Sequence, residues 1–354
     1  MFFVPVVDKN QIPLMPTTAN RAARWIASRK ATPFWKRGIF CVRLNVAASG
    51  RTLQVIALGV DPGSKKEGYT VKSDSHTYIN LNVDAITWIS DAVKTRRTMR
   101  RSRRSRKTPC RACRSNRNVN DRLSPSTRAL WNWKLRISLW LQRMYPITIF
   151  VVEDIVAITK PGKHKWNKSF SPLEVGKKWF YLELSKLGRV ETKQGYETKA
   201  LRDTHGLKKS KKKMANIFSA HCVDSWVLAN WFVGGHIKPD NTRMLAVTPL
   251  HFHRRQLHRL QPEAGGKRKP YGGTLSNGFV RGSLVHHPKH GLTYIGGERD
   301  DCVSLRSIKT GKRLCQNAKP TDLKFRTFNT WRTNMLLNKN NAISDHPASL
   351  RENL

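Results

Sequence analysis

Two apolar segments end in acidic residues, and a strongly basic stretch separates them along the chain. Leu53–Val60 is followed by Asp61, and Ile147–Val152 is followed by Glu153. Short apolar runs of this kind, bounded by turn residues or proline, predict buried β-strands. The basic stretch between them has no apolar face, so it must lie outside the core. We therefore predict an α/β fold whose core is split into two parts of the sequence.

Several other segments are expected to complete this core. Gly68–Lys72 and Thr77–Val83 read as two strands of a meander that follows the first strand. Helices are predicted where a capping residue or an apolar repeat begins, at Ser124–Tyr145, Ser171–Gly188 and Ile217–Phe232.

Changes in composition divide the chain into five expected parts, which are residues 1–52, 53–91, 92–120, 121–250 and 251–354. The first part carries two predicted strands, Phe2–Val7 and Ile39–Val46, and a helix that Thr17 or Thr18 can cap. The last part is rich in glycine, histidine and basic residues, and its short strand-like pieces predict a small β-rich domain.

The charge balance predicts a polyanionic partner. The 354 residues include 66 Lys and Arg against 23 Asp and Glu, a formal net charge of +43. A compact body with this charge repels itself, and nucleic acid is the polyanion that relieves the repulsion best. No signal peptide or membrane-length apolar run is visible, and the six cysteines are scattered, so we expect an intracellular protein without disulfides.

The carboxylates form the candidate catalytic set. Asp61 and Glu153 end two predicted strands, and Asp224 lies on an apolar helix with His221 three residues before it. Carboxylates that converge need positive charge, which two Mg²⁺ ions can supply while activating water for phosphodiester hydrolysis. Taken alone, each residue also fits a turn, an ion pair or a core histidine, and Asp154 should point to the opposite face as a structural residue.

The basic stretch is a candidate nucleic-acid interface. Twelve of the 24 residues from Lys94 to Arg117 are Lys or Arg, and none is acidic. A helix charged on every face cannot be held by packing, so the alternatives are a solvated arm or a helix clamped between phosphate backbones. We favour the clamped helix, whose basic residues are Lys94, Arg96, Arg97, Arg100, Arg101, Arg103, Arg104, Arg106 and Lys107. A second basic loop carries Lys208, Lys209, Lys211, Lys212 and Lys213.

Zinc is the weaker metal prediction. Cys110 and Cys113 form half of a zinc-binding pattern, but no second pair lies nearby, since Cys302 and Cys315 are distant and widely spaced.

Several motifs together resemble a known family. These are Pro13-Leu14-Met15-Pro16, Gly59-Val60-Asp61-Pro62-Gly63-Ser64, the arginine-rich run, Val151-Val152-Glu153-Asp154 and His221-Cys222-Val223-Asp224-Ser225. In this order they are similar to the PLMP motif, the first RuvC segment, the bridge helix, and the second and third RuvC segments of the IscB and IsrB proteins. Those proteins belong to IS200/IS605-type transposons and are relatives of CRISPR type II effector nucleases.

The resemblance implies a fold and an activity. It implies a PLMP domain at 1–52, a split RNase H-like (RuvC) core at 53–91 and 121–250, a bridge helix at 92–120, and a C-terminal region that contacts RNA and a target-adjacent motif. Asp61, Glu153 and Asp224 would bind Mg²⁺, with Mn²⁺ as a substitute, and His221 would act as general base. The partners would be omega RNA and double-stranded target DNA, bound by a monomeric protein in the prokaryotic cytoplasm near the nucleoid.

One departure distinguishes two branches of that family. IscB proteins carry an HNH nuclease between the second and third RuvC segments, whereas Glu153 and Asp224 are only 71 positions apart here. The shorter form resembles IsrB, which implies nicking of the displaced, non-target strand. An unguided structure-specific RuvC-type nuclease and a non-enzymatic RNA-binding protein remain the alternatives.

Overall fold

The computed structural model describes residues 3–48, 50, 53–105, 123–154, 172–251, 256–257, 271–272 and 274–336. Its centre is a seven-stranded mixed sheet in the order β20-β10-β7-β6-β5-β8-β9. The strands are β5 (Ala57–Asp61), β6 (Lys66–Lys72), β7 (Thr77–Asp84), β8 (Ile149–Asp154), β9 (Arg189–Gln194), β10 (Met244–Pro249) and β20 (Trp331–Leu336).

The order of these strands defines the fold class. β5, β6 and β7 form an antiparallel meander, and β8 and β9 then add in parallel on the other side of β5. Three antiparallel strands extended by two parallel strands beside the first strand are the RNase H-like arrangement. The predicted α/β fold with a split RNase H-like core is therefore confirmed.

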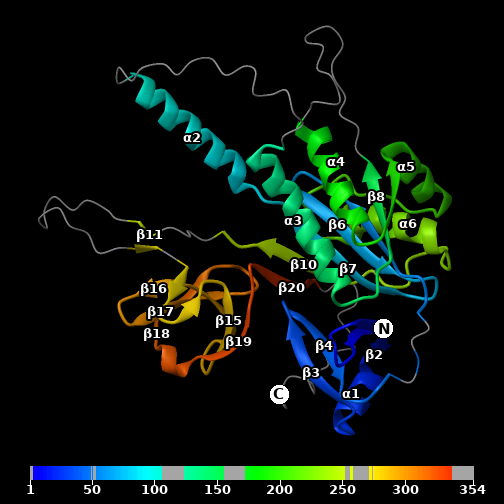
Figure 1. The fold of residues 1–354 in the computed structure, drawn as a ribbon, viewed down its shortest axis with the longest axis horizontal. Helices are drawn as coiled ribbons and strands as arrows, with labels where there is room; N and C mark the ends of the chain where they lie inside the picture. The colour runs from blue at the N-terminus through cyan, green and yellow to red at the C-terminus, as the bar shows by residue number, and fades with distance from the viewer. Residues whose placement is uncertain are drawn as a thin grey trace, which may run out of the picture.

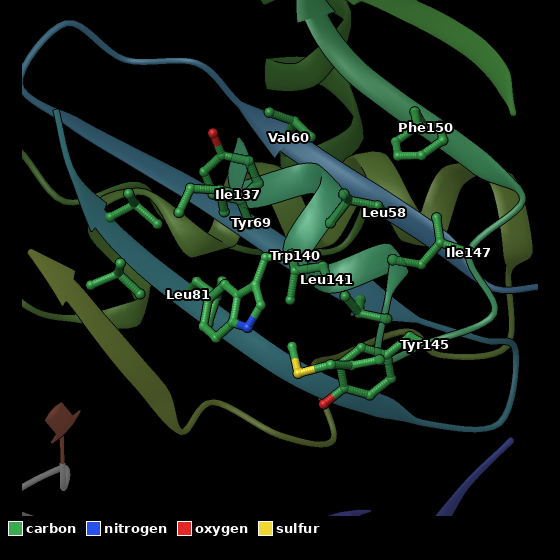
Figure 2. Close-up of a cluster of buried hydrophobic side chains, with 14 of the residues drawn as sticks. Leu58, Val60, Tyr69, Leu81, Ile137, Trp140, Leu141, Tyr145, Ile147 and Phe150 are labelled. Carbon is green, nitrogen blue, oxygen red and sulfur yellow. The ribbon is translucent and has the colours of Figure 1, made fainter. Parts of the chain in front are cut away.

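Helices cover both faces of the central sheet (Figure 1). α3 (Pro125–Gln142) and α4 (Pro172–Ser185) lie on one face, where apolar side chains of α3 meet the meander strands (Figure 2). α6 (Cys222–Val233) packs on the other face, against Ala57, Ile149 and Val151. This division follows from the alternation along β5, in which Leu58 and Val60 face α3 while Ala57 faces α6.

The N-terminal residues form a separate four-stranded sheet in the order β2-β1-β4-β3. Its elements are β1 (Phe3–Val7), β2 (Pro13–Thr18), α1 (Ala19–Ala27), β3 (Ala31–Lys36) and β4 (Ile39–Leu44). Thr18 caps α1, because its hydroxyl accepts a hydrogen bond from the Arg21 amide at 3.4 Å. β3 was not expected from the sequence; it pairs with β4 along its whole length.

A second β-rich unit lies in the C-terminal part, as predicted. Its five-stranded sheet has the order β18-β17-β16-β15-β19 and encloses its own apolar cluster. The strands are β15 (Ser283–His287), β16 (Gly291–Arg299), β17 (Cys302–Ser307), β18 (Arg313–Ala318) and β19 (Lys324–Phe328). Two short hairpins, β11 (Gln256–Leu257) with β12 (Tyr271–Gly272) and β13 (Leu275–Ser276) with β14 (Phe279–Val280), precede it.

The chain then returns to the central sheet, which the sequence did not suggest. β20 lies within the expected C-terminal part, yet it pairs antiparallel with β10 at the edge of the core. Trp331 anchors this return because it is fully buried and its ring meets Trp133 and Trp140 of α3 at centroid distances of 5.6 and 5.2 Å.

The arginine-rich stretch begins as one long helix, α2 (Trp88–Ser105), which projects away from the sheet (Figure 1). Its described side chains from Ser90 onward are all exposed, as expected of a helix without an apolar face. Arg106, Lys107, Cys110 and Cys113 lie outside the described residues, and so does the side chain of Arg103. Among the described residues, none of the helices combines the length and apolar character needed to span a membrane.

The interval between β8 and α6 differs from the sequence prediction in two ways. β9 and α5 (Gly195–Thr204) follow α4, and neither was expected from the sequence. The predicted Ile217–Phe232 helix is also interrupted, because Phe218–Ala220 forms a short 3-10 helix and α6 begins only at Cys222. His221 has φ −137°, outside the helical region, so it lies before α6 rather than one turn along the same helix face as Asp224.

Candidate active site

Three carboxylates from three elements meet at one edge of the central sheet. Asp61 ends β5, Glu153 lies near the end of β8, and Asp224 lies in the first turn of α6. β5 and β8 are parallel neighbours, with Val60 opposite Val152, so the next residue of each strand reaches the same edge. The side chains of Asp61 and Glu153 are hydrogen-bonded to each other. All three residues are buried, with 4%, 9% and 0% of their surfaces exposed.

Glycines allow α6 to come close enough to complete this set. A Cβ atom at Gly59 would lie 1.8 Å from the Ser225 carbonyl oxygen. A Cβ at Gly68 would lie 2.4 Å from the carbonyl oxygen of His221. No side chain fits in either space, so these two strand glycines permit the contact between the sheet and the start of α6.

Two cations occupy both carboxylate oxygens of Asp224. The Arg202 guanidinium, from α5, donates to Oδ1, and the Lys209 ammonium, from the loop before α6, donates to Oδ2. Lys209 Nζ also lies 4.0 Å from Asp61 Oδ2. The buried carboxylates are therefore compensated by side chains of the protein itself.

The environment drives the pKa values of Asp61 and Glu153 apart. Burial raises the pKa of Glu153 most, and the negative charges of Asp61 and Asp224 add to this, so that it reaches about 8. Burial also acts to raise the pKa of Asp61, but the hydrogen bond from His221 and the charge of Lys209 outweigh it and the net shift is downward. Glu153 therefore holds the proton of the pair at neutral pH and donates it to Asp61.

Asp224 and Lys209 each shift the pKa of the other. Burial and the nearby charge of Asp61 raise the pKa of Asp224, against the opposing effects of Lys209 and Arg202. Burial acts to lower the pKa of Lys209, but the charges of Asp61 and Asp224 outweigh it and raise the pKa, so the ammonium stays charged.

His221 joins the site through both ring nitrogens. Nδ1 lies 3.4 Å from Asp61 Oδ2, and Nε2 donates to the carbonyl oxygen of Lys213 at 2.8 Å. Burial acts to lower the pKa of His221, but these two oxygen partners outweigh it and raise the pKa. These contacts stabilise the protonated ring relative to that of a free histidine, and a protonated ring must lose a proton before it can act as the predicted general base.

Asp154 belongs to a different group of side chains. Lys177 Nζ of α4 lies 2.6 Å from its Oδ1, and Tyr181 and Gln194 donate hydrogen bonds to it. Asp154 was expected to point away from Glu153, and its contacts are with α4 and β9 rather than with the three carboxylates.

The three carboxylates are suitable ligands for a divalent cation, although the oxygens of Asp224 are already paired with Arg202 and Lys209. Buried carboxylates from Asp61, Glu153 and Asp224 are hard oxygen ligands of the kind that Mg²⁺ prefers, and burial together with the charges of the other two raises the pKa of Glu153 to about 8. Among the described residues, however, no group of three His, Cys, Asp or Glu side chains is arranged to hold a metal ion as it stands. The Lys209 ammonium, which is paired with Asp224 and lies 4.0 Å from Asp61 Oδ2, is close to two of these carboxylates.

The predicted nucleic-acid contacts separate into two groups. Lys94, Arg96, Arg97, Arg100, Arg101 and Arg104 are exposed along α2. Lys208, Lys211, Lys212 and Lys213 are exposed on the loop before α6. Lys209 of the same loop is also exposed in part, with 32% of its side chain accessible, but its ammonium is paired with Asp224 in the acidic site. Sequence reasoning missed this role of Lys209 and that of Arg202. The charge of the carboxylates required cations, but nothing in the sequence selected these two among 66 basic residues.

Comparisons with known proteins cover part of the chain. Residues 4–164 match the family described as RRXRR protein, a range that includes Asp61, Glu153 and α2. Within α2, residues 100–104 read Arg-Arg-Ser-Arg-Arg, the pattern in the family's name. Among solved structures, "T. thermophilus RuvC in complex with Holliday junction substrate" is similar, with 11% identity and a TM-score of 0.28, over 51% of this chain and 98% of that one. None of the curated proteins matches the chain.

Proposed function

We propose that this protein is an RNA-guided DNA endonuclease that nicks the displaced strand at one metal-dependent site. The observation that carries the proposal is the meeting of Asp61, Glu153 and Asp224 at one edge of an RNase H-like sheet, buried in an otherwise strongly basic protein. Buried carboxylates without a function would destabilise the fold, because each loses hydration and repels the others.

The site residues would have three different roles in the reaction. Asp61, Glu153 and Asp224 would hold the divalent cations, Mg²⁺ in the first place. Cations bound there would supply an activated water and would stabilise the charge that develops during phosphodiester hydrolysis. His221 orients Asp61 through its Nδ1 contact, and its neutral form would be the one able to accept a proton. Arg202 would remain on Asp224 and hold that carboxylate in place.

The single-site part of the proposal rests on how the chain fills the interval between Glu153 and Asp224. Residues 172–204 of this interval belong to α4, β9 and α5 of the core itself. Residues 155–171 are too few to form an additional nuclease domain, since independent domains need about 50 residues or more. One active site gives one cut, and therefore a nick.

The guided part of the proposal rests on the basic surfaces. α2 is one helix whose described arginines are exposed, and exposed arginines on several faces suit contact with more than one phosphate backbone. An RNA that pairs with one DNA strand displaces the other as a flexible single strand. The lysines before α6 lie beside the acidic site, where they could lead that strand to the carboxylates.

The test begins with the RNA that co-purifies with the protein. Its sequence is determined, its guide portion is reprogrammed, and a matching supercoiled plasmid is incubated with the complex and Mg²⁺. We expect open circles, with the break on the strand that does not pair with the guide, and no reaction with a scrambled guide. Linear plasmid at early times, or cleavage that ignores the guide and selects branched DNA, would overturn the proposal in favour of two cutting sites or an unguided nuclease.

A further inference from the structure

Lys209 occupies a position that a metal ion would need. Its ammonium is paired with Asp224 Oδ2 and lies 4.0 Å from Asp61 Oδ2, so it lies between two of the three carboxylates. Its charge also lowers the pKa of Glu153, although burial and the charges of Asp61 and Asp224 outweigh this effect. An ammonium and a divalent cation cannot share this space, because both require close contact with the same oxygens.

Arg202 and His221 are held more firmly than Lys209. The Arg202 side chain, on α5, is 13% exposed and takes the opposite oxygen of Asp224, so it can stay when a cation arrives. His221 is fixed at both ring nitrogens. Lys209 comes from a loop, and its side chain is 32% exposed, so it can swing outward into solvent.

The backbone around Lys209 is anchored independently of its side chain, whose ammonium is paired with Asp224. The amide of Ser210 donates to the Ser219 carbonyl at 2.8 Å, and the Lys213 carbonyl accepts from His221. Displacement therefore needs only a rotation of the lysine side chain, which leaves the loop and the start of α6 in place.

The neighbours of Lys209 indicate which kind of ligand would displace its side chain from the acidic site. Lys208, Lys211, Lys212 and Lys213 are exposed on the same loop. A phosphodiester backbone that approaches these lysines offers Lys209 a new anionic partner just outside the acidic site. A neutral ligand or an isolated cation offers no such partner.

We propose that Lys209 is a built-in competitor for the metal ion, and that the phosphates of a bound DNA strand withdraw it so that cation and strand bind cooperatively. This inference rests on the proposed function, because it takes the three carboxylates as a cation site. Cooperativity is reciprocal: the strand raises the affinity for the cation by the same factor as the cation raises the affinity for the strand.

The test measures Mn²⁺ binding to the full-length protein, free of nucleic acid, from the electron paramagnetic resonance signal of free Mn²⁺. Lys209→Met keeps the bulk of the side chain and removes the competitor, so it should bind Mn²⁺ about tenfold more tightly than wild type. Lys238→Met, an exposed lysine without a role in the site, is the matched control and should bind as wild type does. Lys209→Gln repeats the test should the methionine variant fold poorly.

The second arm adds a DNA 12-mer whose phosphodiester bonds are replaced by a nuclease-resistant analogue of equal charge. We expect Mn²⁺ affinity of wild type to rise toward that of Lys209→Met, and the affinity of Lys209→Met to change little. Binding of Mn²⁺ to the DNA itself is subtracted with Asp61→Asn protein under the same conditions.

The outcomes separate the inference from the proposed function. If Asp61→Asn binds Mn²⁺ as tightly as wild type does, the carboxylates are not a cation site and the proposed function fails. If wild type has an Asp61-dependent site but Lys209→Met binds Mn²⁺ with wild-type affinity, or the DNA has no effect, the competitor role of Lys209 is wrong while the proposed function stands.

Discussion

Replacing Glu153 with Gln should stabilise the metal-free protein, and increasingly so as the pH rises. Glu153 is 9% exposed, and burial together with the charges of Asp61 and Asp224 raises its pKa from an ordinary value of 4.5 to about 8. The folded protein therefore keeps a proton that the unfolded chain releases between these two values. Glutamine has nearly the same shape and can still donate to Asp61, but it cannot ionise.

The magnitude follows from proton linkage. The stabilising effect of the raised pKa is fully present below the unfolded value of 4.5 and is lost as the pH rises toward the folded value of about 8. Each pH unit in this window removes about 1.4 kcal/mol of folding free energy. Between about pH 6 and about pH 8, Glu153 alone should remove about 2 kcal/mol from wild type, because the slope falls by half at the folded pKa, and it should remove nothing from Glu153→Gln.

Urea unfolding in the presence of a chelator, at a series of pH values, measures this difference. Asp154→Asn is the matched control, because burial raises the pKa of Asp154 but Lys177, Gln194 and Tyr181 outweigh it and lower the pKa, so this carboxyl is ionised throughout the window. Its stability should fall with pH as steeply as that of wild type. Parallel curves for wild type and Glu153→Gln would refute the shared-proton description of the site.

Three further predictions concern packing and the basic helix. Gly59→Ala places a Cβ 1.8 Å from the Ser225 carbonyl oxygen, so α6 must move. We expect the free energy of unfolding to fall by about 2 kcal/mol and Mn²⁺ binding to be lost, and an unchanged melting temperature would contradict this close contact. Trp331→Ala empties a fully buried position at the edge of the core and should cost about 3–5 kcal/mol in chemical denaturation, whereas a loss below about 1 kcal/mol would show that β20 does not stabilise the core. Replacement of Arg97, Arg101 and Arg104 by Ala should leave the free energy of unfolding nearly unchanged. The slope of the logarithm of the nucleic-acid binding constant against the logarithm of salt concentration should fall by about one unit per lost phosphate contact, and an unchanged slope would show that α2 is a solvated arm.

The parts of the fold that the sequence predicts are those in which local pattern and burial agree. β5 and β8 are apolar on both faces because helices cover both sides of the sheet, so both read as strands, and their acidic ends led to Asp61 and Glu153. The start of α3 was predictable for a local reason, since Ser124 caps the helix and Pro125 occupies its first position.

The parts that were missed depend on contacts between distant residues. β9 reads Arg-Val-Glu-Thr-Lys-Gln, a polar segment that becomes a strand only because β8 offers it a parallel partner. β20 joins the core through Trp331, which lies about two hundred positions from its ring partners in α3. The break before α6 has a similar origin, since His221 leaves the helix to contact Asp61 and the Lys213 carbonyl.

The most direct test of a single carboxylate site is a comparison of cleavage by three proteins under one condition. Wild type, Asp61→Asn and Asp154→Asn are each loaded with the same guide RNA, and the conversion of matching supercoiled plasmid to open circle is followed in Mg²⁺. Wild type and Asp154→Asn should nick the plasmid, and Asp61→Asn should bind it without nicking. Nicking by Asp61→Asn at the wild-type rate would contradict the assignment of these three carboxylates as the active site.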